Sequence, residues 1–521
     1  MTDITTVSDI IRVHGAHRAD HPALIEGERR ATWGELLARS SQVANLLAAN
    51  GVGNQDRVAF LDKNGFEHFE VFYGAALLNA VCVDVNWRLA APEVEYIVND
   101  AQSKVLVVGV DFLPILDAIA ANLTTVTKIL VINGDGRYAD YGAEVAAQPA
   151  TDPGVPSAAG DVAFQLYSSG TTGRPKGVML SNNNFFSLLP VAKDIWELTP
   201  DAVNLVAMPL FHIGGGGWAV AGQYEGCPSV IVRDLNPAAL VTLFGEQRIT
   251  HAFLVPAVLQ FMLAVPGVEE ADYSSLRMFL YGASPISEEV LAKSVKMFGC
   301  KFWQTYGLTE TTGAVVNLPP EDHDLEGPNR HRLRSCGLPG PGVEIRIVDT
   351  DSLVDCVVGE VGEIWIRSPQ VMIGYWNMPE ETEKSITPDG WFRSGDAGYL
   401  DQDGYLFIHA RVKDMIVSGG ENVYPAEVEN VLMGHPAIAD VAVIGVSDER
   451  WGETAKAVVV RKPGVEVTDT EIIEYARERL ARFKCPTTVD WADALPRNPT
   501  GKILKKDLRA PYWEGRERMV N

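Results

Sequence analysis

Short apolar runs recur through the first 300 residues, and they constrain the fold more than any other feature of the sequence. Stretches with helical periodicity separate or follow these runs, and Ser287–Met297 is one example. Strands that alternate with helices are typical of layered α/β folds with partly parallel sheets. We therefore expect an α/β architecture. The expected strands are Lys104–Val110, Lys128–Asn133, Asn204–Met208, Ser229–Val232, Ala252–Val255 and Leu276–Tyr281.

The pattern of apolar and polar residues changes near residue 335. Segments Val343–Asp349 and Gly362–Arg367 alternate apolar and polar residues and are separated by Gly and Pro. This pattern predicts a smaller, β-rich unit. A chain of 521 residues has room for about two to four domains in all.

The last part of the chain indicates a further module. Pro425 suits the first turn of a helix over Ala426–Leu432. Thr468 and Glu471 have the spacing of a capping box, which predicts a helix that runs to about Arg482. Between these helices we expect strands at Val441–Val446 and Ala455–Arg461.

The charge balance excludes some partners. Acidic residues outnumber basic ones by 68 to 44, which gives a formal net charge of −24. A protein that binds nucleic acid or an anionic membrane by nonspecific attraction carries the opposite sign. Charge is screened beyond about 8 Å at physiological salt, so a local basic patch can still bind an anionic ligand. Residues 471–521 form such a region, with 11 Lys and Arg against 8 Asp and Glu.

The cysteines and the apolar runs indicate the cellular compartment of the protein. The six cysteines lie far apart and form no C-x-x-C pair, which argues against a zinc site or a disulfide framework. Asp3 and Asp9 stand where a secretory signal would carry lysines. No apolar run reaches the ~18 residues of a membrane-spanning helix. We therefore expect a cytoplasmic protein, with peripheral membrane association left open.

The strongest motif is YSSGTTGRPKG, from Tyr167 to Gly177. Its glycines let the backbone approach a ligand and turn N–H groups toward it. Its four Ser and Thr hydroxyls add donors, and Lys176 adds a mobile positive charge. The spacing of a Walker A loop is absent. We interpret the segment as a polyphosphate-binding loop, and a flexible surface loop is the alternative.

A second motif, QTYGLTETTG, runs from Gln304 to Gly313. The ring of Tyr306 is able to stack on a base, and Thr309 adds a hydroxyl. A carboxylate at Glu310 beside phosphates suits Mg²⁺, a hard cation that takes oxygen ligands. A helix N-terminus with bonded hydroxyls would give the same pattern.

Two further motifs lie closer to the C-terminus. Asp396 ends the segment GWFRSGD and is a candidate acceptor for the vicinal hydroxyls of a sugar. Arg411 begins RVKDMI and could bind a phosphate or ribose, although both segments also fit surface turns. In PRNPTGKI, from Pro496 to Ile503, two prolines and a glycine hold Lys502 on a stiff loop. Most lysines are solvated surface groups, so this last motif carries weight only with the others.

These four motifs, in this order, resemble those of the adenylate-forming superfamily of acyl- and aryl-CoA synthetases, peptide-synthetase adenylation domains and luciferases. The likeness runs from about residue 8 to 510, and IVSGGENVYP at Ile416–Pro425 is most similar to bacterial fatty-acid–CoA ligases. The resemblance implies a large N-terminal domain of α/β subdomains plus a β-rich subdomain, residues 1–411. It also implies a small, mobile α+β C-terminal domain, residues 412–521, with a hinge near Lys413.

The resemblance further implies ATP, Mg²⁺ and coenzyme A as cofactors, and it gives roles to single residues. The phosphates of ATP would be held by Ser168, Ser169, Gly170, Thr171, Thr172, Gly173 and Lys176. The site of the base would contain Gly282, Ala283, Ser284, Gln304, Tyr306 and Gly307. The ribose would be bound by Asp396 and Arg411, and Mg²⁺ by Thr172 and Glu310.

Other implied roles concern the reaction itself. Thr309 would touch the α-phosphate, and Lys502 would reach both the acyl carboxylate and the α-phosphate. Gly419 and Gly420 would line the tunnel for pantetheine after the C-terminal domain has rotated. Glu310 and His212 complete the expected catalytic set.

His212 matches the family's histidine at the acyl pocket, and a packing histidine is the alternative. The glycines after it remove side-chain volume, which suggests room for a bulky or long acid. Some long-chain members carry a tryptophan gate four residues after this histidine, whereas Trp218 comes six after it and also fits the core. The expected acyl-site residues are His212, Gly214, Gly215, Gly216, Gly217, Trp218 and Val255.

Three histidines near the N-terminus, His14, His17 and His21, have helix-like spacing. No cluster of Cys, Asp or Glu with ligand geometry accompanies them. We do not interpret them as a metal site.

The expected activity is ligation of a carboxylic acid to coenzyme A. A carboxylate is a poor acyl donor because its leaving group would be oxide, and formation of an acyl-adenylate with loss of diphosphate removes this obstacle. We expect a medium- or long-chain fatty acid or a steroid-derived acid as substrate. An aryl-CoA ligase, transfer to a carrier-protein thiol and a nucleotide-binding regulator without turnover are the alternatives, and a homodimer is left open.

Replacement of Lys502 tests its implied role. Lys502→Ala should cost the adenylation step a few kcal/mol of transition-state stabilisation. Transfer from preformed acyl-AMP to the thiol should be spared, because the charge serves only the first step. The two half-reactions are measured separately, and equal losses in both would contradict the role.

Overall fold

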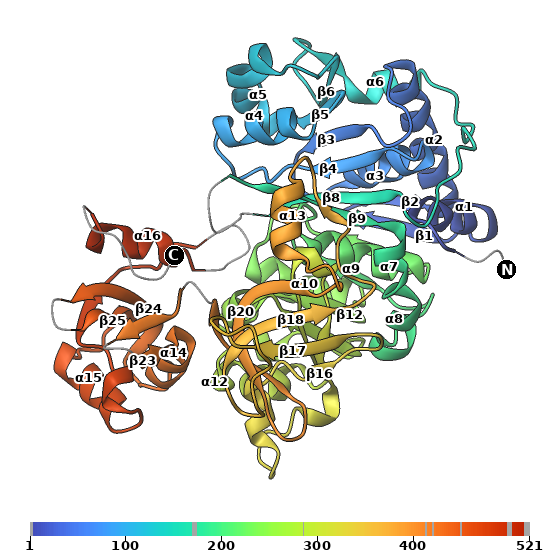
Figure 1. Ribbon diagram of the computed structural model, residues 1–521. Helices are drawn as coiled ribbons and strands as arrows, with labels where there is room; N and C mark the ends of the chain where they lie inside the picture. Colours follow the sequence, from blue (N-terminus) through green and yellow to red (C-terminus); the bar gives the residue numbers. More distant parts are fainter. Residues whose placement is uncertain are drawn as a thin grey trace.

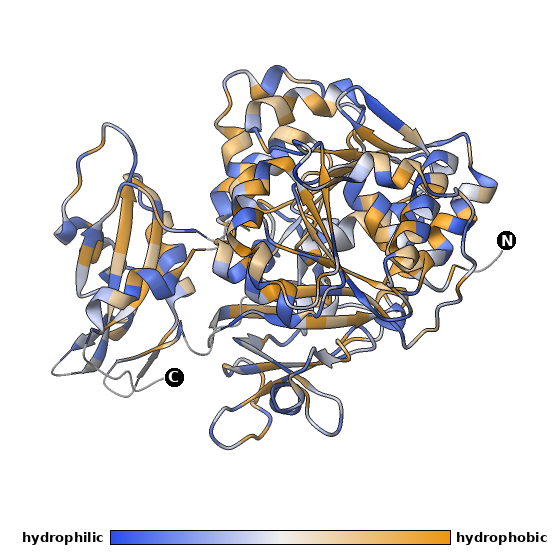
Figure 2. Ribbon diagram, turned by 90° about the horizontal axis from the view of Figure 1, so that it is seen from above, coloured by the Kyte–Doolittle hydropathy of each residue, from blue (hydrophilic) through white to orange (hydrophobic). Residues whose placement is uncertain are grey.

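The computed structural model describes residues 4–168, 174–284, 286–411, 414–418, 421–448, 451–497 and 503–514. Two large sheets lie one beside the other in the main body, with a small antiparallel sheet at its edge (Figure 1). The C-terminal unit stands apart from this body in both ribbon views (Figures 1 and 2).

The first large sheet has eight strands in the order β19-β9-β8-β4-β3-β5-β6-β7. Its central strands are parallel and buried along their whole length, as expected when helices cover both faces of a sheet. The strands are β3 (Arg57–Leu61), β4 (Val81–Asp84), β5 (Val105–Gly109), β6 (Lys128–Ile132), β7 (Ala139–Asp140), β8 (Val162–Ser168), β9 (Lys176–Ser181) and β19 (Gly374–Tyr375).

Helices pack on both faces of this sheet and define two apolar layers. One layer contains side chains of α4 (Ala91–Asp100) and α5 (Leu113–Ile119). The other joins the main core through α2 (Trp33–Ala49), α3 (Phe66–Leu77) and α6 (Tyr141–Ala146). Helix α1 (Val7–His17) packs against α2 and α3 and starts with a capping box at Thr6 and Asp9.

The second large sheet has nine strands in the order β16-β15-β14-β13-β12-β10-β11-β1-β2. Apolar side chains of this sheet and of the first belong to one continuous core. The strands are β1 (Pro22–Glu26), β2 (Arg29–Thr32), β10 (Asn204–Val206), β11 (Ser229–Ile231), β12 (His251–Leu254), β13 (Met278–Gly282), β14 (Lys301–Tyr306), β15 (Val316–Leu318) and β16 (Leu338–Pro339). The helices of this part of the chain are α7 (Asn182–Phe186), α8 (Leu189–Trp196), α9 (Ile213–Tyr224), α10 (Pro237–Glu246), α11 (Pro256–Leu263) and α12 (Glu288–Phe298).

The β-rich unit expected after residue 335 is a four-stranded antiparallel sheet in the order β17-β18-β20-β21. Helix α13 (Pro379–Ser385) lies between β19 and β20 in the chain and packs against both. The strands are β17 (Glu344–Val348), β18 (Gly362–Arg367), β20 (Phe392–Leu400) and β21 (Leu406–Arg411).

The C-terminal unit has its own sheet and its own apolar clusters. One cluster lies under α14 (Pro425–Met433) and α15 (Asp469–Arg477), and the other lies toward α16 (Lys505–Arg509). The strands are β22 (Ile416–Ser418), β23 (Glu421–Val423), β24 (Ile438–Asp448), β25 (Gly452–Arg461) and β26 (Thr488–Trp491). A separate core is consistent with the expected C-terminal domain, whose boundary at 411/412 stays a prediction.

The predicted α/β layers are confirmed, and each expected strand is present, with ends that differ from the expected ones by at most three residues. Ser287 caps α12, and Thr468 and Glu471 form the expected capping box of α15. The expected extent of α15 to Arg482 is wrong, because the helix ends at Arg477. Pro486 disfavours helical geometry at Cys485, which is extended and leads into β26. Among the described residues, no helix is both long and apolar enough to cross a membrane.

In the second sheet region His251 is buried and His323 is half-buried, and loss of solvation lowers the pKa of both. The pKa of His323 falls to about 4, and so does that of His251. The ring of His323 lies 3.0 Å from the Tyr281 hydroxyl through Nε2 and 2.9 Å from the Pro319 carbonyl through Nδ1. The folded chain therefore keeps His323 neutral in the range where the unfolded chain protonates it.

This difference predicts a pH-dependent stability. Between about pH 6.5 and 4 the unfolded chain binds more protons, so stability falls as the pH falls. From pH 7 to 5 the loss due to His323 should be about 2 kcal/mol. Urea unfolding at both pH values should show a smaller loss for His323→Gln than for the wild type. Identical losses would contradict the assignment.

Candidate active site

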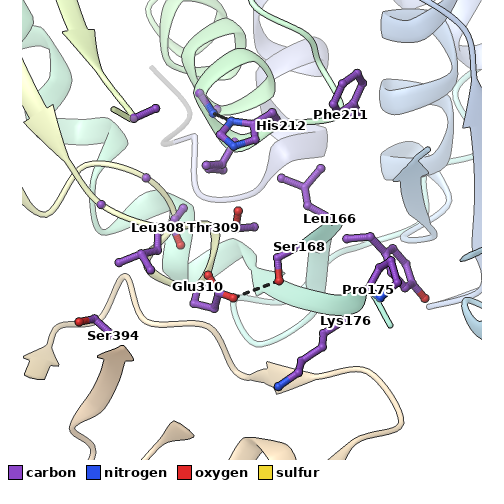
Figure 3. Close-up of a pocket in the computed structure, with 18 of the residues that line it drawn as sticks. Leu166, Ser168, Pro175, Lys176, Phe211, His212, Leu308, Thr309, Glu310 and Ser394 are labelled. Atoms are coloured by element: carbon purple, nitrogen blue, oxygen red, sulfur yellow. Dashed lines mark hydrogen bonds between the residues drawn. The ribbon is translucent and has the colours of Figure 1, made fainter. Parts of the chain in front are cut away.

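A cavity of about 1070 Å³ is lined by residues of the two large sheets, the small antiparallel sheet and the C-terminal unit. Its walls come from the ends of β4 and β8, the start of β9, helices α7 to α9, the turn after β14 and the region of α13. Asp414, Lys506 and Arg509 of the C-terminal unit also line it. Figure 3 shows part of this lining, with Ser168, Lys176, His212, Thr309 and Glu310 around one space.

One wall of the cavity is a hydrogen-bonded junction on the Glu310 carboxylate. The Ser168 hydroxyl donates to Glu310 Oε1 at 3.1 Å (Figure 3), and the Tyr375 hydroxyl donates to the same oxygen at 3.2 Å. The main chain of Met372 also donates to the Glu310 carbonyl at 2.8 Å. Burial and the nearby Glu310 charge raise the pKa of Tyr375, so its hydroxyl stays a donor.

The turn that presents Thr309 and Glu310 depends on glycine. A Cβ on Gly307 would overlap the carbonyl oxygen of Gly313, so only glycine fits where the loop closes on itself. The Thr311 hydroxyl accepts a hydrogen bond from the Leu308 N–H at 2.9 Å and fixes the turn from inside. The short 3₁₀ segment Thr309–Thr311 therefore stands on a defined base.

Lys176 begins β9 and lines the same end of the cavity. Its Nζ lies 2.6 Å from Glu381 Oε2 and 4.9 Å from the centre of the Tyr375 ring. Glu381 also accepts from Lys384 Nζ at 2.8 Å. Hydrogen bonds from Lys176 and Lys384 lower the pKa of Glu381 to about 2.

The residues expected around base and ribose lie side by side. The Tyr306 hydroxyl donates to Asp396 Oδ2 at 2.8 Å. Asp396 on β20 stands opposite Arg411 on β21 in the register of the two antiparallel strands. Ala283 lines the cavity with a φ of 64°, a left-handed conformation that is uncommon outside glycine. Such strain clusters at functional sites.

The predicted nucleotide residues divide into two groups. Ser168, Lys176, Ala283, Gly307, Thr309 and Glu310 line the cavity. Gly282, Ser284, Gln304, Tyr306 and Asp396 lie outside its lining. Gln304 instead accepts a hydrogen bond from the Tyr281 hydroxyl at 3.2 Å. The remaining predictions concern residues outside the described part of the chain, and the same holds for the side chain of Arg411. These residues are Ser169, Gly170, Thr171, Thr172, Gly173, Lys413, Gly419, Gly420 and Lys502.

An apolar arm of the cavity extends between α7, α8, α9 and β12. Trp196 and Trp218 pack edge to face with ring centres 5.9 Å apart, and the Trp218 indole donates to the Leu205 carbonyl at 3.0 Å. Trp218 is therefore both core and cavity wall. The arm is lined by Phe185, Leu188, Leu189, Trp196, Trp218, Ala221 and Phe253.

His212 lies across the cavity from Thr309 and Glu310 (Figure 3), and the helix that starts after it carries Trp218 and Ala221 of the apolar arm. It caps α9, and its Nδ1 accepts a hydrogen bond from the Gly214 N–H at 3.1 Å. A neutral ring whose Nδ1 accepts must carry its proton on Nε2. The cap therefore fixes both the ring orientation and its tautomer.

The four glycines that follow His212 do not act alike. Gly214 and Gly217 line the cavity, whereas Gly215 and Gly216 do not. A Cβ on Gly215 would lie 2.1 Å from the Pro209 carbonyl oxygen, and one on Gly216 would lie 2.8 Å from that of Leu210. Gly215 and Gly216 thus serve the close approach of α9 to the preceding loop rather than the size of the pocket. Val255 also lies outside the lining.

Other lining residues escaped the sequence motifs. They include Asp84, Asn86 and Glu93 near β4 and α4, Lys384 on α13 and Lys506 on α16. Each comes from a segment without a distinctive local pattern, and only the fold brings them together. His14 bonds the Tyr224 carbonyl through Nε2, and the described residues contain no group of three or more potential metal ligands.

Comparison with known proteins identifies the class. The model of the AMP-binding enzyme family matches residues 11–376, and that of the AMP-binding enzyme C-terminal domain matches residues 427–502. The chain therefore belongs to the AMP-binding enzyme family. It is an adenylate-forming ligase of the acyl-CoA synthetase class, as the motifs predicted.

Individual relatives extend over nearly the whole chain. The sequence is 38% identical to fatty acid–[acyl-carrier-protein] ligase ScoC of Streptomyces coeruleorubidus, covering 99% of this chain and 98% of the relative. It is 39% identical to long-chain-fatty-acid–CoA ligase FadD13 of Mycobacterium tuberculosis, covering 93% of each. ATP-bound MatB of Rhodopseudomonas palustris is similar in structure with a TM-score of 0.88, 30% identity and coverage of 97% and 99%.

The glycine assignments predict that one added methyl group has a large effect on stability at Gly215 and a small effect at Gly217. Gly215→Ala should lower the free energy of unfolding by about 3 kcal/mol, because its Cβ meets main-chain atoms. Gly217→Ala should change stability by less than about 1 kcal/mol, because its Cβ meets the flexible end of Ile213, 3.1 Å away, and alanine favours a helix. Urea unfolding of both variants measures the difference, and similar losses would refute it.

Proposed function

We propose that the chain activates an aliphatic carboxylic acid with ATP and transfers the acyl group to the thiol of coenzyme A. The observation that carries this proposal is the single cavity in which a polar end around Glu310 and Lys176 meets an apolar arm at His212. An acyl-adenylate has the same division, with a charged nucleotide on one side of a carbonyl and an apolar tail on the other.

The apolar arm favours an acid with a substantial hydrocarbon part. Its lining side chains are buried, and none of those named above carries a charge. Each CH₂ group that enters such a site gains about 0.8 kcal/mol. The two curated relatives described above are named for fatty acids, which agrees with this reading.

His212 is suited to the carbonyl end of the acid. With Nδ1 accepting from Gly214, its Nε2–H is a donor at the junction of the two parts of the cavity. This donor would orient the substrate carboxylate toward the polar end. Fixing a reactant in this way removes entropy from the barrier before the reaction starts.

In the first step, a carboxylate oxygen forms a bond to the α-phosphorus and the bond from that phosphorus to diphosphate breaks. Negative charge builds on phosphate oxygens during this step. Lys176 would bind the phosphates that leave, and Thr309 would donate to the α-phosphate. Tyr306 and Asp396 would hold the base and ribose, which agrees with their contact of 2.8 Å.

The donor set suits a Mg²⁺ ion that arrives with the nucleotide. Glu310 offers a hard oxygen ligand beside the phosphate end, and the described residues hold no all-protein metal cluster. Mg²⁺ is commonly bound by one or two carboxylates plus substrate phosphates. Glu310 would hold it, and the ion would neutralise phosphate charge.

In the second step, the thiol loses its proton to solvent, its sulfur bonds to the carbonyl carbon, and the bond from that carbon to the AMP oxygen breaks, so that AMP leaves. The thiol and Lys502 would need the same side of the carbonyl. A rotation of the C-terminal domain about Lys413 would exchange them, as in other hinge motions that complete a site. Basic residues of this domain, such as Lys506, would favour the phosphates of coenzyme A.

A carrier-protein thiol is a second candidate acceptor. One curated relative that matches 99% of this chain is named as a ligase for an acyl carrier protein. The adenylation step and its residues would be the same. Only the molecule that brings the thiol would differ.

Release of AMP tests the proposal. With ATP and Mg²⁺, AMP release should require coenzyme A and should be fastest with aliphatic acids in a panel that also holds aromatic and steroidal acids. Release that needs holo-acyl carrier protein instead would establish the second acceptor. Preference for an aromatic acid would contradict the aliphatic substrate, and no AMP or diphosphate exchange would contradict the ligase itself.

A variant assayed with the same panel of acids tests where the acyl tail of the substrate binds. Ala221→Phe should fill the apolar arm, so kcat/KM for long acids should fall by about tenfold or more while short acids are retained within a few-fold. The retained activity on short acids controls for folding. Equal losses for all chain lengths would place the tail elsewhere.

A further inference from the structure

The helix α13 brings a second lysine and a carboxylate to the phosphate end of the cavity. Glu381 Oε2 lies 2.6 Å from Lys176 Nζ, and Glu381 Oε1 lies 2.8 Å from Lys384 Nζ. One carboxylate thus bridges two ammonium groups from segments more than 200 residues apart in the chain. Lys384 and its neighbour Ser385 line the same cavity as Lys176.

We propose that Lys384 is a second phosphate-binding lysine of this site and that Glu381 is an internal anion that competes with phosphates for both lysines. The inference rests on the proposed function, because that function assigns the phosphates of ATP to this end of the cavity. It adds a binding residue and a counter-ion that no motif in the sequence indicates.

The charges of the cluster support the competition. Lys176 and Lys384 carry two positive charges and Glu381 one negative charge. With its pKa lowered to about 2, the Glu381 carboxylate stays ionised throughout the physiological range. A phosphate group that approaches either ammonium therefore meets an anion already bound to it.

The two lysines differ in how firmly they are held. The Lys176 side chain is 16% exposed and also lies over the Tyr375 ring, so its position is well defined. The Lys384 side chain is 69% exposed, and ion pairs of such exposed groups are weak. Lys384 is therefore able to leave Glu381 for a phosphate at little cost, while Lys176 stays in place.

The wider contacts connect this cluster to the reaction centre. Tyr375 touches Lys176 through its ring and Glu310 through its hydroxyl. Phosphates bound by Lys176, and by a Mg²⁺ ion held at Glu310, would thus lie beside α13. On departure of diphosphate, Glu381 would re-form both ion pairs, which would lower the affinity for this product and favour its release.

Binding of inorganic pyrophosphate and of ATP, each with MgCl₂, tests the inference by calorimetry on the full-length chain. Glu381→Gln should bind pyrophosphate about fivefold more tightly, and Lys384→Met about fivefold more weakly. Both effects should shrink at high salt, because the charges are partly exposed. Tighter binding is a result that structural damage does not produce.

Matched controls remove the same charges elsewhere. Glu383→Gln changes an exposed carboxylate on the same helix, and Lys293→Met changes an exposed lysine on α12. Both should bind pyrophosphate within twofold of the wild type. Equal or weaker binding by Glu381→Gln, or unchanged binding by Lys384→Met, would overturn the inference while leaving the ligase function intact. A wild type that binds neither ATP nor pyrophosphate would overturn both.

Discussion

The site depends on the Glu310 carboxylate, where three distant segments of the chain meet. Ser168 reaches it from the end of β8, Tyr375 reaches it from β19, and Glu310 itself stands on the turn after β14. These contacts join the first large sheet to the second at the cavity. Buried and part-buried hydrogen bonds to a charged group are among the stronger ones in proteins. The wall of the cavity around Glu310 is therefore held by hydrogen bonds within the protein itself.

Close main-chain packing determines the shape of the acyl side of the cavity. The helix α9 starts at His212 and approaches the preceding loop closely because Gly215 and Gly216 carry no side chain. This approach sets the position of the His212 ring and of Trp218, which lies six residues further along the chain. Pocket size is therefore a result of how α8 and α9 pack around Trp196 and Trp218, and not of the glycine run by itself.

Local sequence patterns predicted the parts of the fold that local physics determines. The short apolar strands, the capping box at Thr468 and the family motifs around Ser168 and Glu310 were all recognisable. The apolar arm was not, because Leu188, Trp196 and Phe253 look like ordinary core residues until packing places them on one cavity. Lys384 likewise resembles a solvated lysine. Gly215 and Gly217 differ in the atoms that an added Cβ would meet, and only the three-dimensional structure shows which atoms these are.

A crystal structure with a non-hydrolysable acyl-adenylate analogue would test the central claim, that one cavity divides at His212 into a nucleotide end and an acyl arm. We expect the acyl tail between Trp196, Trp218 and Phe253, with its carbonyl within hydrogen-bond distance of His212 Nε2. The adenosine should lie beside Tyr306 and Asp396. A tail that leaves the protein elsewhere, or a carbonyl far from His212, would contradict it.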